Sequence, residues 1–320
     1  MRGVIIGWLA LCLGGGMGCV KAQSPYPTKS IRLLVPNAPG GGADSSARIF
    51  AQGLSLVFGH PVVVDNRAGA GGNVSGDMAA HAPPDGYTVL WGSVSHSVGV
   101  SLSAKPGYDL VKDFSPTAQL VMVPYGVAIH PSLPAKTLKD LIALAKQKPH
   151  LINFATSGSG TYLAAQLFSD MAQIHMTSVL YKGGSPGLVA LLSGEVSMSF
   201  TSLVSILPHV KTAKVRLLAV TSANRSVAAP EYPTVIQAGL AGFEATSWYG
   251  PLLPKGTAQG VVERWTQECN KLLQDSALRT RLIDNGVEPV GGTSAEFAAH
   301  IKSEVEKWAK VIKKTGARMD

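Results

Sequence analysis

The stretch Ile31-Arg32-Leu33-Leu34-Val35-Pro36-Asn37-Ala38-Pro39-Gly40-Gly41-Gly42-Ala43-Asp44 decides how this chain folds. It predicts a buried strand, then a glycine turn, then a helix that runs to about Phe58. Three consecutive glycines allow positive φ angles and let the backbone approach a ligand without Cβ clashes. The following helix presents unpaired N–H groups and the positive end of its dipole, so the turn suits an anion. A flexible strand–helix connection without a ligand is an equally good interpretation of this stretch taken alone.

A second stretch, Asn153-Phe154-Ala155-Thr156-Ser157-Gly158-Ser159-Gly160-Thr161, repeats this design. It combines a short strand, a Gly/Ser turn and a helix in which Leu163, Leu167 and Met171 recur with helical spacing. Two anion-receptive helix starts that lie far apart in the sequence predict two lobes that face each other.

Strand and helix patterns alternate along the rest of the chain, which indicates the α/β class with parallel sheets. Side-chain caps mark two helix starts, one at Thr137 and one at the capping box Thr293–Glu296. The β-branched or aliphatic runs that we expect to form strands are Pro61–Asp65, Thr88–Trp91, Thr177–Leu180, Val196–Phe200 and Val215–Val220.

Two extended segments, near 120–135 and 245–257, indicate where the chain passes between lobes. Each contains an apolar run together with prolines, which is typical of an extended crossing. Two crossings imply a discontinuous first lobe that is closed by the C-terminal helices, with a cleft between the lobes. We therefore expect lobe 1 to comprise residues 23–126 and 247–320, and lobe 2 to comprise residues 127–246.

Residues 1–22 have the features of a signal peptide. Arg2 supplies the positive n-region, Val4–Leu13 the apolar region, and Val20-Lys21-Ala22 a cleavage site. The apolar run is too short and too rich in glycine to be a convincing membrane span. Lipid attachment at Cys19 is an alternative that we favour less than cleavage near Ala22, because the residues before Cys19 fit a lipoprotein site poorly.

Composition excludes several classes of protein. The 28 Lys and Arg residues outnumber the 20 Asp and Glu residues, giving a formal net charge of +8, but they form no long basic run, so nucleic acid is not an expected partner. After signal cleavage Cys269 is the last thiol left, and it cannot form an internal disulfide. The eight histidines lack the spacing of metal ligands, so we expect no metal and no other cofactor.

Several motifs in the chain occur in an order that closely resembles one family. They are Pro39–Asp44, Val64–Gly72, Pro84–Thr88, Tyr181–Gly184 and Leu218–Ser222. The chain resembles the substrate-binding receptors of tripartite tricarboxylate transporters, also called the Bug family, over essentially its whole mature length. The resemblance implies a periplasmic type II binding-protein fold with two lobes, two crossover strands and a cleft that closes on a small organic acid. It implies a monomer that works with membrane permease subunits and is not an enzyme.

The resemblance also assigns a site. In that family the loop after the first strand and the loop before a later helix hold ligand carboxylates through backbone N–H groups, hydroxyls and ordered waters. An aspartate common after the Met-Phe strand is replaced here by Thr201, which favours a ligand without an amino group. We expect a dicarboxylate to bind somewhat better than a monocarboxylate, because it can satisfy both loops. The candidate ligand-binding residues are Pro39, Gly40, Gly41, Gly42, Ala43, Asp44, Ser157, Gly158, Ser159, Gly160, Thr161 and Thr201.

Two residue assignments within this site stay open. Asp44 is interpreted equally well as an acid that stabilises the helix dipole and as a direct ligand contact. A histidine that commonly follows the second loop is absent, because Thr161 is followed directly by Tyr162 and Leu163. The detailed ligand contacts of the family can therefore be assigned to this chain less well at the second loop than at the first.

Two other functions compete with transport. Gly183-Gly184-Ser185-Pro186-Gly187 matches the nucleophile elbow of exported hydrolases, but Pro186 has no N–H to donate to an oxyanion. We expect Ser185 instead to be a helix N-cap, with Pro186 at the first helical position. A receptor that signals to a membrane sensor kinase would share the same fold and site, so the sequence leaves it open.

Overall fold

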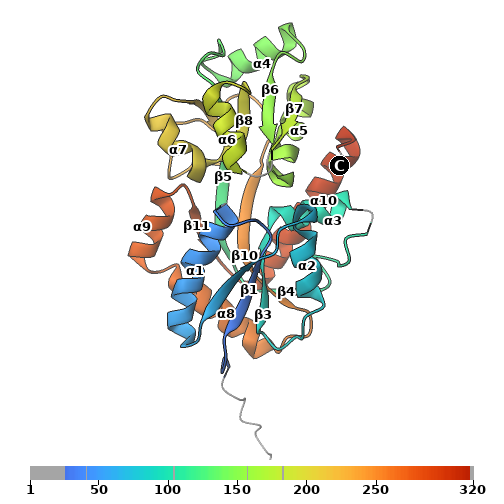
Figure 1. Cartoon of the computed structure of the whole chain (residues 1–320), viewed down its shortest axis with the longest axis vertical. Coiled ribbons are helices and arrows are strands. Elements are labelled where there is room, and N and C mark those ends of the chain that lie inside the picture. Colours follow the sequence, from blue (N-terminus) through green and yellow to red (C-terminus); the bar gives the residue numbers. More distant parts are fainter. Residues whose placement is uncertain (1–25, 41, 104, 157, 182–183, 318–320) are drawn as a thin grey trace, which may run out of the picture.

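A computed structural model describes residues 26–40, 42–103, 105–156, 158–181 and 184–317. The predicted signal peptide, its cleavage site near Ala22 and Cys19 lie outside the described residues, as do the candidate site residues Gly41 and Ser157. The described chain forms two lobes that are stacked along the long axis of the molecule (Figure 1). Among these residues, none of the helices combines the length and apolar character needed to span a bilayer.

Lobe 1 is built on three parallel strands with antiparallel strands beside them, and its helices surround this sheet (Figure 1). Its elements are β1 (Ile31–Val35), α1 (Gly42–Phe58), β2 (Val62–Asn66), the short 3₁₀ turn η1 (Ala70–Gly72), α2 (Asn73–Ala80), β3 (Thr88–Ser93), α3 (Val94–Leu102), β4 (Phe114–Pro116), β10 (Thr246–Pro254), α8 (Gln259–Leu272), α9 (Ser276–Asp284), β11 (Glu288–Gly291) and α10 (Ser294–Thr315).

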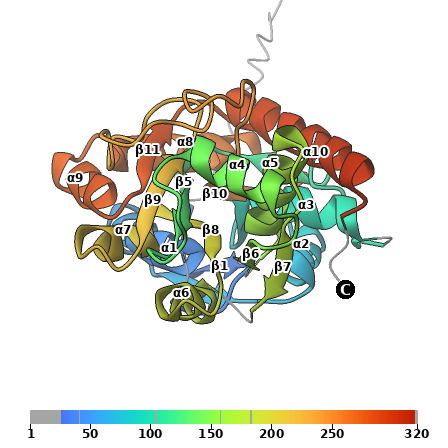
Figure 2. The same ribbon diagram turned by 90° about the horizontal axis from the view of Figure 1, so that it is seen from above.

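Lobe 2 is built on β6, which pairs in parallel with β7 and β8. Its elements are α4 (Leu138–Gln147), β6 (Asn153–Thr156), α5 (Ser159–Ala172), β7 (Thr177–Leu180), α6 (Gly184–Ser193), β8 (Met198–Ser202), α7 (Leu203–Lys211) and β9 (Arg216–Val220). Helices α5 and α6 lie on opposite sides of the sheet (Figure 2). This fits the alternation along β6, where Phe154 joins the core beneath α5 and Ala155 joins the core beneath α6.

The two lobes share β5 (Gln119–Ile129), which changes its partners halfway along. Its first half pairs antiparallel with β10, where Val121 faces Tyr249 and Pro124 faces Thr246. Its second half pairs antiparallel with β8 and β9 in lobe 2. The expectation of two crossover strands is confirmed, with β5 leaving lobe 1 and β10 returning to it. The residue limits given above for the lobes stay a prediction, although the change of partner after Pro124 lies close to them.

The expectation of parallel sheets is correct for the strand–helix–strand units but wrong for the crossover strands. Strands β1 to β3, and β6 with its two neighbours, run in parallel. Strands β5 and β10 run antiparallel to each other because one carries the chain out of lobe 1 and the other carries it back through the same junction. This antiparallel pair joins the two sheets into one continuous hydrogen-bonded order.

The caps predicted from the sequence are present. Thr137 Oγ1 accepts a hydrogen bond from the Asp140 N–H at 3.1 Å, and Thr293 Oγ1 accepts one from the Glu296 N–H at 3.2 Å. Each cap is reciprocated, since the acidic side chain returns to the N–H of the capping threonine. These contacts fix the starts of α4 and α10.

Helix α10 packs against both lobes. Its buried face includes Phe297 and Trp308, and it packs on α3 in lobe 1 and on α5 in lobe 2. Glu304, buried on α10, accepts hydrogen bonds from the indole N–H groups of Trp248 at 3.3 Å and Trp308 at 3.0 Å. Because Trp248 belongs to β10, this contact holds the returning crossover strand against the helix.

Candidate ligand-binding site

A cavity of about 300 Å³ lies between the two lobes, and the crossover strands form its floor. Val123 and Tyr125 of β5 lie beside Ser247 and Tyr249 of β10, and in each strand these are alternate residues on one face. The described residues that line the cavity are Asn37, Ala38, Pro39, Gly40, Gly42, Ala43, Val94, Ser95, Val123, Tyr125, Gly158, Gly160, Thr161, Gly184, Ser185, Pro186, Leu188, Thr201, Ser202, Ser205, Ser247 and Tyr249.

The walls of this cavity are the N-terminal ends of five helices. Lobe 1 contributes the starts of α1 and α3, and lobe 2 contributes the starts of α5, α6 and α7. Each start leaves backbone N–H groups without a partner inside its helix and carries roughly half a positive charge from the helix dipole. The convergence of these ends makes the cavity electropositive, although none of the described lining residues has a cationic side chain.

The cavity lining is polar but uncharged. Among the described residues that line it, none has a charged side chain, and the polar groups are hydroxyls and the amide of Asn37. Ser202 Oγ is buried and has no hydrogen-bond partner among the described residues, and the same is true of Thr156 and Ser159 just behind the second loop. The Ser202 hydroxyl lines the cavity and is free to bind a ligand or a water that a ligand holds, whereas Thr156 and Ser159 do not line it.

The two tyrosines of the floor are neutral hydrogen-bonding groups. Burial raises the pKa of the Tyr125 hydroxyl far above its ordinary value, and the neighbouring Tyr249 adds to the rise while the Ser247 hydroxyl opposes it. Burial likewise raises the pKa of Tyr249, again with Ser247 opposing. Both phenols therefore keep their protons at any physiological pH and can donate to an anion.

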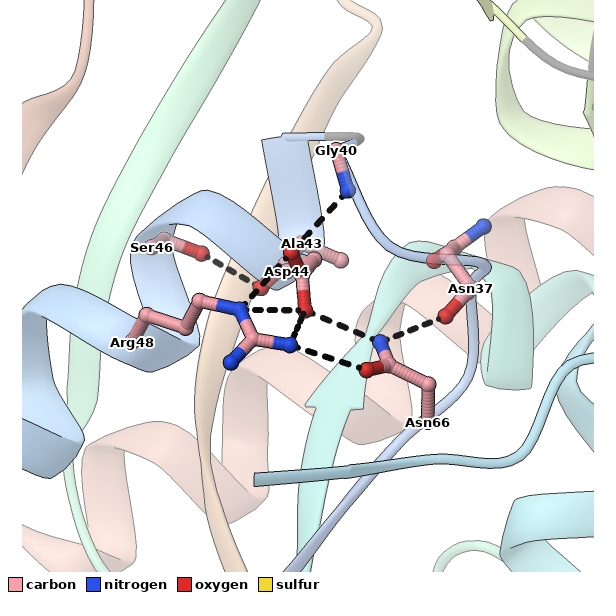
Figure 3. Close-up of polar contacts among 7 residues, drawn as sticks. All are labelled: Asn37, Gly40, Ala43, Asp44, Ser46, Arg48 and Asn66. Carbon is pink, nitrogen blue, oxygen red and sulfur yellow. Dashed lines mark hydrogen bonds and ion pairs between the residues drawn. The ribbon is translucent and has the colours of Figure 1, made fainter. Parts of the chain in front are cut away.

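Asp44 holds the glycine loop in place (Figure 3). Its buried carboxylate accepts hydrogen bonds at 3.0 Å from the Gly40 N–H, from Arg48 Nε and from Asn66 Nδ2. Asn66 also donates to the carbonyl oxygen of Asn37 at 2.8 Å, so both ends of the segment 37–40 are tied to one cluster. Burial raises the pKa of Asp44, but the hydrogen bonds from Arg48, Gly40 and Asn66 outweigh burial and lower the pKa overall.

The structure brings most of the predicted site residues together around one cavity. Those that line it are Pro39, Gly40, Gly42, Ala43, Gly158, Gly160, Thr161 and Thr201. Asp44 and Ser159 do not line it. The Asp44 carboxylate accepts a hydrogen bond from the Gly40 N–H, which favours a role inside the protein, and a ligand contact by Asp44 stays a prediction. Contact between the lining residues and a ligand remains a prediction.

Several cavity residues were missed by the sequence reasoning. Tyr125, Ser247 and Tyr249 lie on the extended segments that we interpreted only as crossings. Ser95 follows the third parallel strand, where a strand–helix connection could have signalled it, as it did in the two stretches that were recognised. Sequence alternation along the crossing segments was available as a signal, but it does not tell which face of each strand points to the cavity.

The segment that resembles a hydrolase elbow also reaches the cavity. Gly184, Ser185 and Pro186 all line it from the start of α6. The helix begins at Gly184, so Ser185 is not the N-cap and Pro186 is not the first helical residue, as we had expected; both lie within the first turn. In the part of the chain that the structure describes, no group of three His, Cys, Asp or Glu side chains is placed to hold a metal ion.

We expect the Asp44→Ala substitution to lower the free energy of unfolding by about 2 kcal/mol, because it removes charge-assisted hydrogen bonds and leaves Arg48 without its partner. It should also weaken ligand binding, since the segment 37–40 loses its anchor. Chemical denaturation and calorimetric titration measure the two effects. Asp140→Ala is the matched control, because it removes a first-turn acid of α4 remote from the cavity and should leave affinity unchanged. Unchanged affinity in Asp44→Ala would contradict an anchoring role.

Two lobes joined by crossover strands around a cleft define a periplasmic binding protein. A family profile described as "Tripartite tricarboxylate transporter family receptor" matches residues 46–317. The chain therefore belongs to this family of receptors. It is 33% identical over 308 residues to Protein BugT of Bordetella pertussis, covering 95% of this chain and 94% of that protein.

Solved structures agree with this assignment. An R. palustris protein with adipate is 33% identical, with a TM-score of 0.85, and the match covers 92% of this chain and 100% of that one. MatC from Rhodopseudomonas palustris with bound malate is 29% identical, with a TM-score of 0.81 over 90% of this chain and 100% of that one. Members of the family are periplasmic substrate-binding receptors and not enzymes, which decides against the hydrolase.

Proposed function

We propose that this receptor captures a small carboxylate, preferentially a dicarboxylate, and delivers it to the membrane permease subunits of a tripartite tricarboxylate-type transporter. The observation that carries the proposal is the cavity itself, where helix starts from both lobes converge and no described lining residue is charged. Such a site offers donors to anionic oxygens on two sides. A dicarboxylate satisfies both lobes at once, whereas a monocarboxylate satisfies one.

Two further findings support a dicarboxylate. The similar structures named above hold adipate and malate, and each of these acids has two carboxylates. The moderately basic charge of the chain also favours attraction of anionic solutes. We propose in addition that the chain is exported, cleaved near Ala22 and active in the periplasm as a monomer.

Ligand charge provides the test of this function. An anionic oxygen gains about 1.5–3 kcal/mol from each charge-assisted hydrogen bond, whereas an ammonium group needs strong acceptors that Thr201 and Ser202 do not provide. We expect succinate, malate or adipate to bind at least tenfold more tightly than aspartate or glutamate, a difference of about 1.4 kcal/mol. Competition calorimetry measures the order. A tenfold advantage for the amino acids would contradict the proposal.

A further inference from the structure

A second cavity, of about 350 Å³, lies on the side of the molecule where α1, α7 and α9 come together (Figures 1 and 2). Lobe 1 supplies most of its lining, from α1, from α9 and from the residues that follow α9. Lobe 2 supplies Val204, near the start of α7. Gly42 lines both this cavity and the ligand cavity, so the two cavities share the start of α1.

The two lobes touch each other at the edge of the second cavity. A Cβ built at Gly286, which follows α9, would lie 2.9 Å from the Val204 nitrogen and 3.0 Å from the carbonyl carbon of Leu203. The side chain of Val204 packs against the apolar core of lobe 1. Because the walls of the cavity belong to different lobes, hinge motion between the lobes changes its shape. A partner that fits this cavity can therefore distinguish a receptor whose lobes are together from one whose lobes are apart.

The second cavity differs from the ligand cavity in charge. Arg48 and Arg281 line it, and none of its described lining residues is acidic. Arg48 is paired with Asp44 at 3.0 Å, whereas Arg281 forms no ion pair with any described residue. Asp284, on the same helix as Arg281, does not line the cavity. The cavity therefore has an uncompensated positive charge, which favours an anionic partner.

Exposure decides between a small anion and a protein segment as that partner. Arg48 and Arg281 are exposed, so an isolated anion beside them is screened by water and salt and gains little. Ile49 and Val204 line the same cavity, one from each lobe, and both are half-buried. A protein segment that carries a carboxylate can cover these apolar side chains and exclude water from the ion pair, and both effects add to affinity.

We propose that the second cavity is the surface through which the receptor docks onto its membrane permease, and that it takes a permease segment with an acidic side chain beside apolar ones. This inference rests on the proposed function, because it concerns delivery to the permease. Arg281 pairs with the acidic side chain, and Ile49 and Val204 contact the apolar ones. Since Val204 belongs to lobe 2, docking depends on how the lobes are placed, which ligand occupancy biases.

Arg281→Glu reverses the charge at this cavity without altering the ligand cavity, which Arg281 does not line. We test it in cells of the native host from which the receptor gene has been deleted, with whichever of succinate, malate and adipate the wild-type protein binds best. We expect the variant to restore uptake of this labelled acid roughly tenfold less well than the wild-type protein. Its affinity for the acid, measured by calorimetry, should stay within about twofold of the wild-type value.

Arg279→Glu is the matched control. It makes the same charge change at an exposed position of the same helix, but Arg279 does not line the second cavity, so uptake should be restored fully. Arg281→Lys keeps the positive charge and should restore most of the uptake. Thermal melting of the purified variants shows whether each one is folded.

Photo-crosslinking identifies the partner directly. A photoreactive amino acid in place of Arg281 should capture a permease subunit in membranes of the native host, identified by mass spectrometry. We expect roughly tenfold more capture with the saturating acid than without it, because the cavity needs both lobes. The same amino acid in place of Arg279 should capture little of that subunit under either condition.

The outcomes separate this inference from the proposed function. If uptake does not depend on the wild-type receptor, the proposed delivery fails and the docking surface fails with it. If the wild-type receptor supports uptake but folded Arg281→Glu supports it equally well, only the docking surface is overturned. Equal losses of uptake in Arg281→Glu and Arg279→Glu, a loss of uptake matched by a loss of affinity, or capture of a protein other than the permease from position 281 would also overturn it.

Discussion

Gly160→Val should weaken ligand binding roughly 10- to 100-fold, because the new side chain has no room beside Tyr125 and Val94 in the cavity. Its Cβ alone would lie 2.6 Å from the Tyr125 hydroxyl and 2.9 Å from a methyl group of Val94. Val94 starts α3 in lobe 1, whereas Gly160 lies in α5 of lobe 2, so the clash occurs where the lobes meet. The contact with Val94 disfavours closure, whereas the contact with Tyr125 lies within lobe 2, because Tyr125 pairs with Ser202 of β8.

Small-angle scattering and calorimetry measure this effect. Saturating adipate or succinate should reduce the radius of gyration of the wild-type protein, and we expect a much smaller reduction for Gly160→Val. Lys146→Val is the control, because it places the same side chain on an exposed position of α4 in lobe 2, outside the residues that line the cavity. Normal closure and normal affinity in Gly160→Val would show that the start of α5 is not part of the interface that closes.

The parts of the fold that depend on neighbouring residues were predictable. The strand Thr177–Leu180 has the bounds expected from its residues, and the helix after the first glycine turn ends at Phe58 as expected. The caps at Thr137 and Thr293 need only residues three positions apart. Such contacts can be predicted from neighbouring residues in the sequence, and the structure confirms them.

The direction of the crossover strands was not predictable in the same way. Whether β5 and β10 run parallel or antiparallel depends on which neighbour each one meets, and their partners come from residues more than 100 positions apart. The cavity floor was unpredictable for the same reason, because its residues lie far apart in the sequence. Tyr125 and Tyr249 are apolar-looking strand residues in the sequence, and only the pairing of the strands brings them together.

The role of Asp44 also could not be predicted from the sequence. Its position in the first turn of α1 predicts an interaction with the helix dipole, and a free carboxylate beside a glycine loop equally suggests a ligand contact. The hydrogen bond from Asn66 comes from the end of strand β2, 22 positions further along the chain. That long-range donor, together with Arg48 and the Gly40 N–H, occupies the carboxylate. The negative charge of Asp44 is therefore held by groups of the protein and does not line the cavity.

Acid should destabilise the protein through His96, which fixes the start of α3. The ring is fully buried, and its Nδ1 accepts a hydrogen bond from the Ser93 N–H at 3.1 Å while its Nε2 lies 3.1 Å from Ser75 Oγ. Because Ser93 donates to Nδ1, the proton of the neutral ring must be on Nε2, from which it reaches Ser75. Burial lowers the pKa of His96 to about 4, so the folded protein strongly favours the neutral ring.

The sign of the effect follows from the two pKa values. The unfolded chain protonates its histidines near pH 6.5, whereas folded His96 resists protonation until about pH 4. Its contribution to stability is therefore complete above pH 6.5 and is lost as the pH falls to 4, a total of about 3 kcal/mol. Denaturant titrations at several pH values measure the free energy of unfolding across this window.

His96→Gln is the variant that isolates this contribution. Glutamine at the third helical position is a natural partner of a serine N-cap, so it can keep the hydrogen bond to the Ser93 N–H without titrating. We expect the variant to lose about 3 kcal/mol less than the wild-type protein between pH 6.5 and 4. Other groups with lowered pKa values, such as His300 and Asp44, are present in both proteins, so their contributions cancel in the difference. Parallel pH profiles for the two proteins would mean that His96 is not the group through which acid acts on α3.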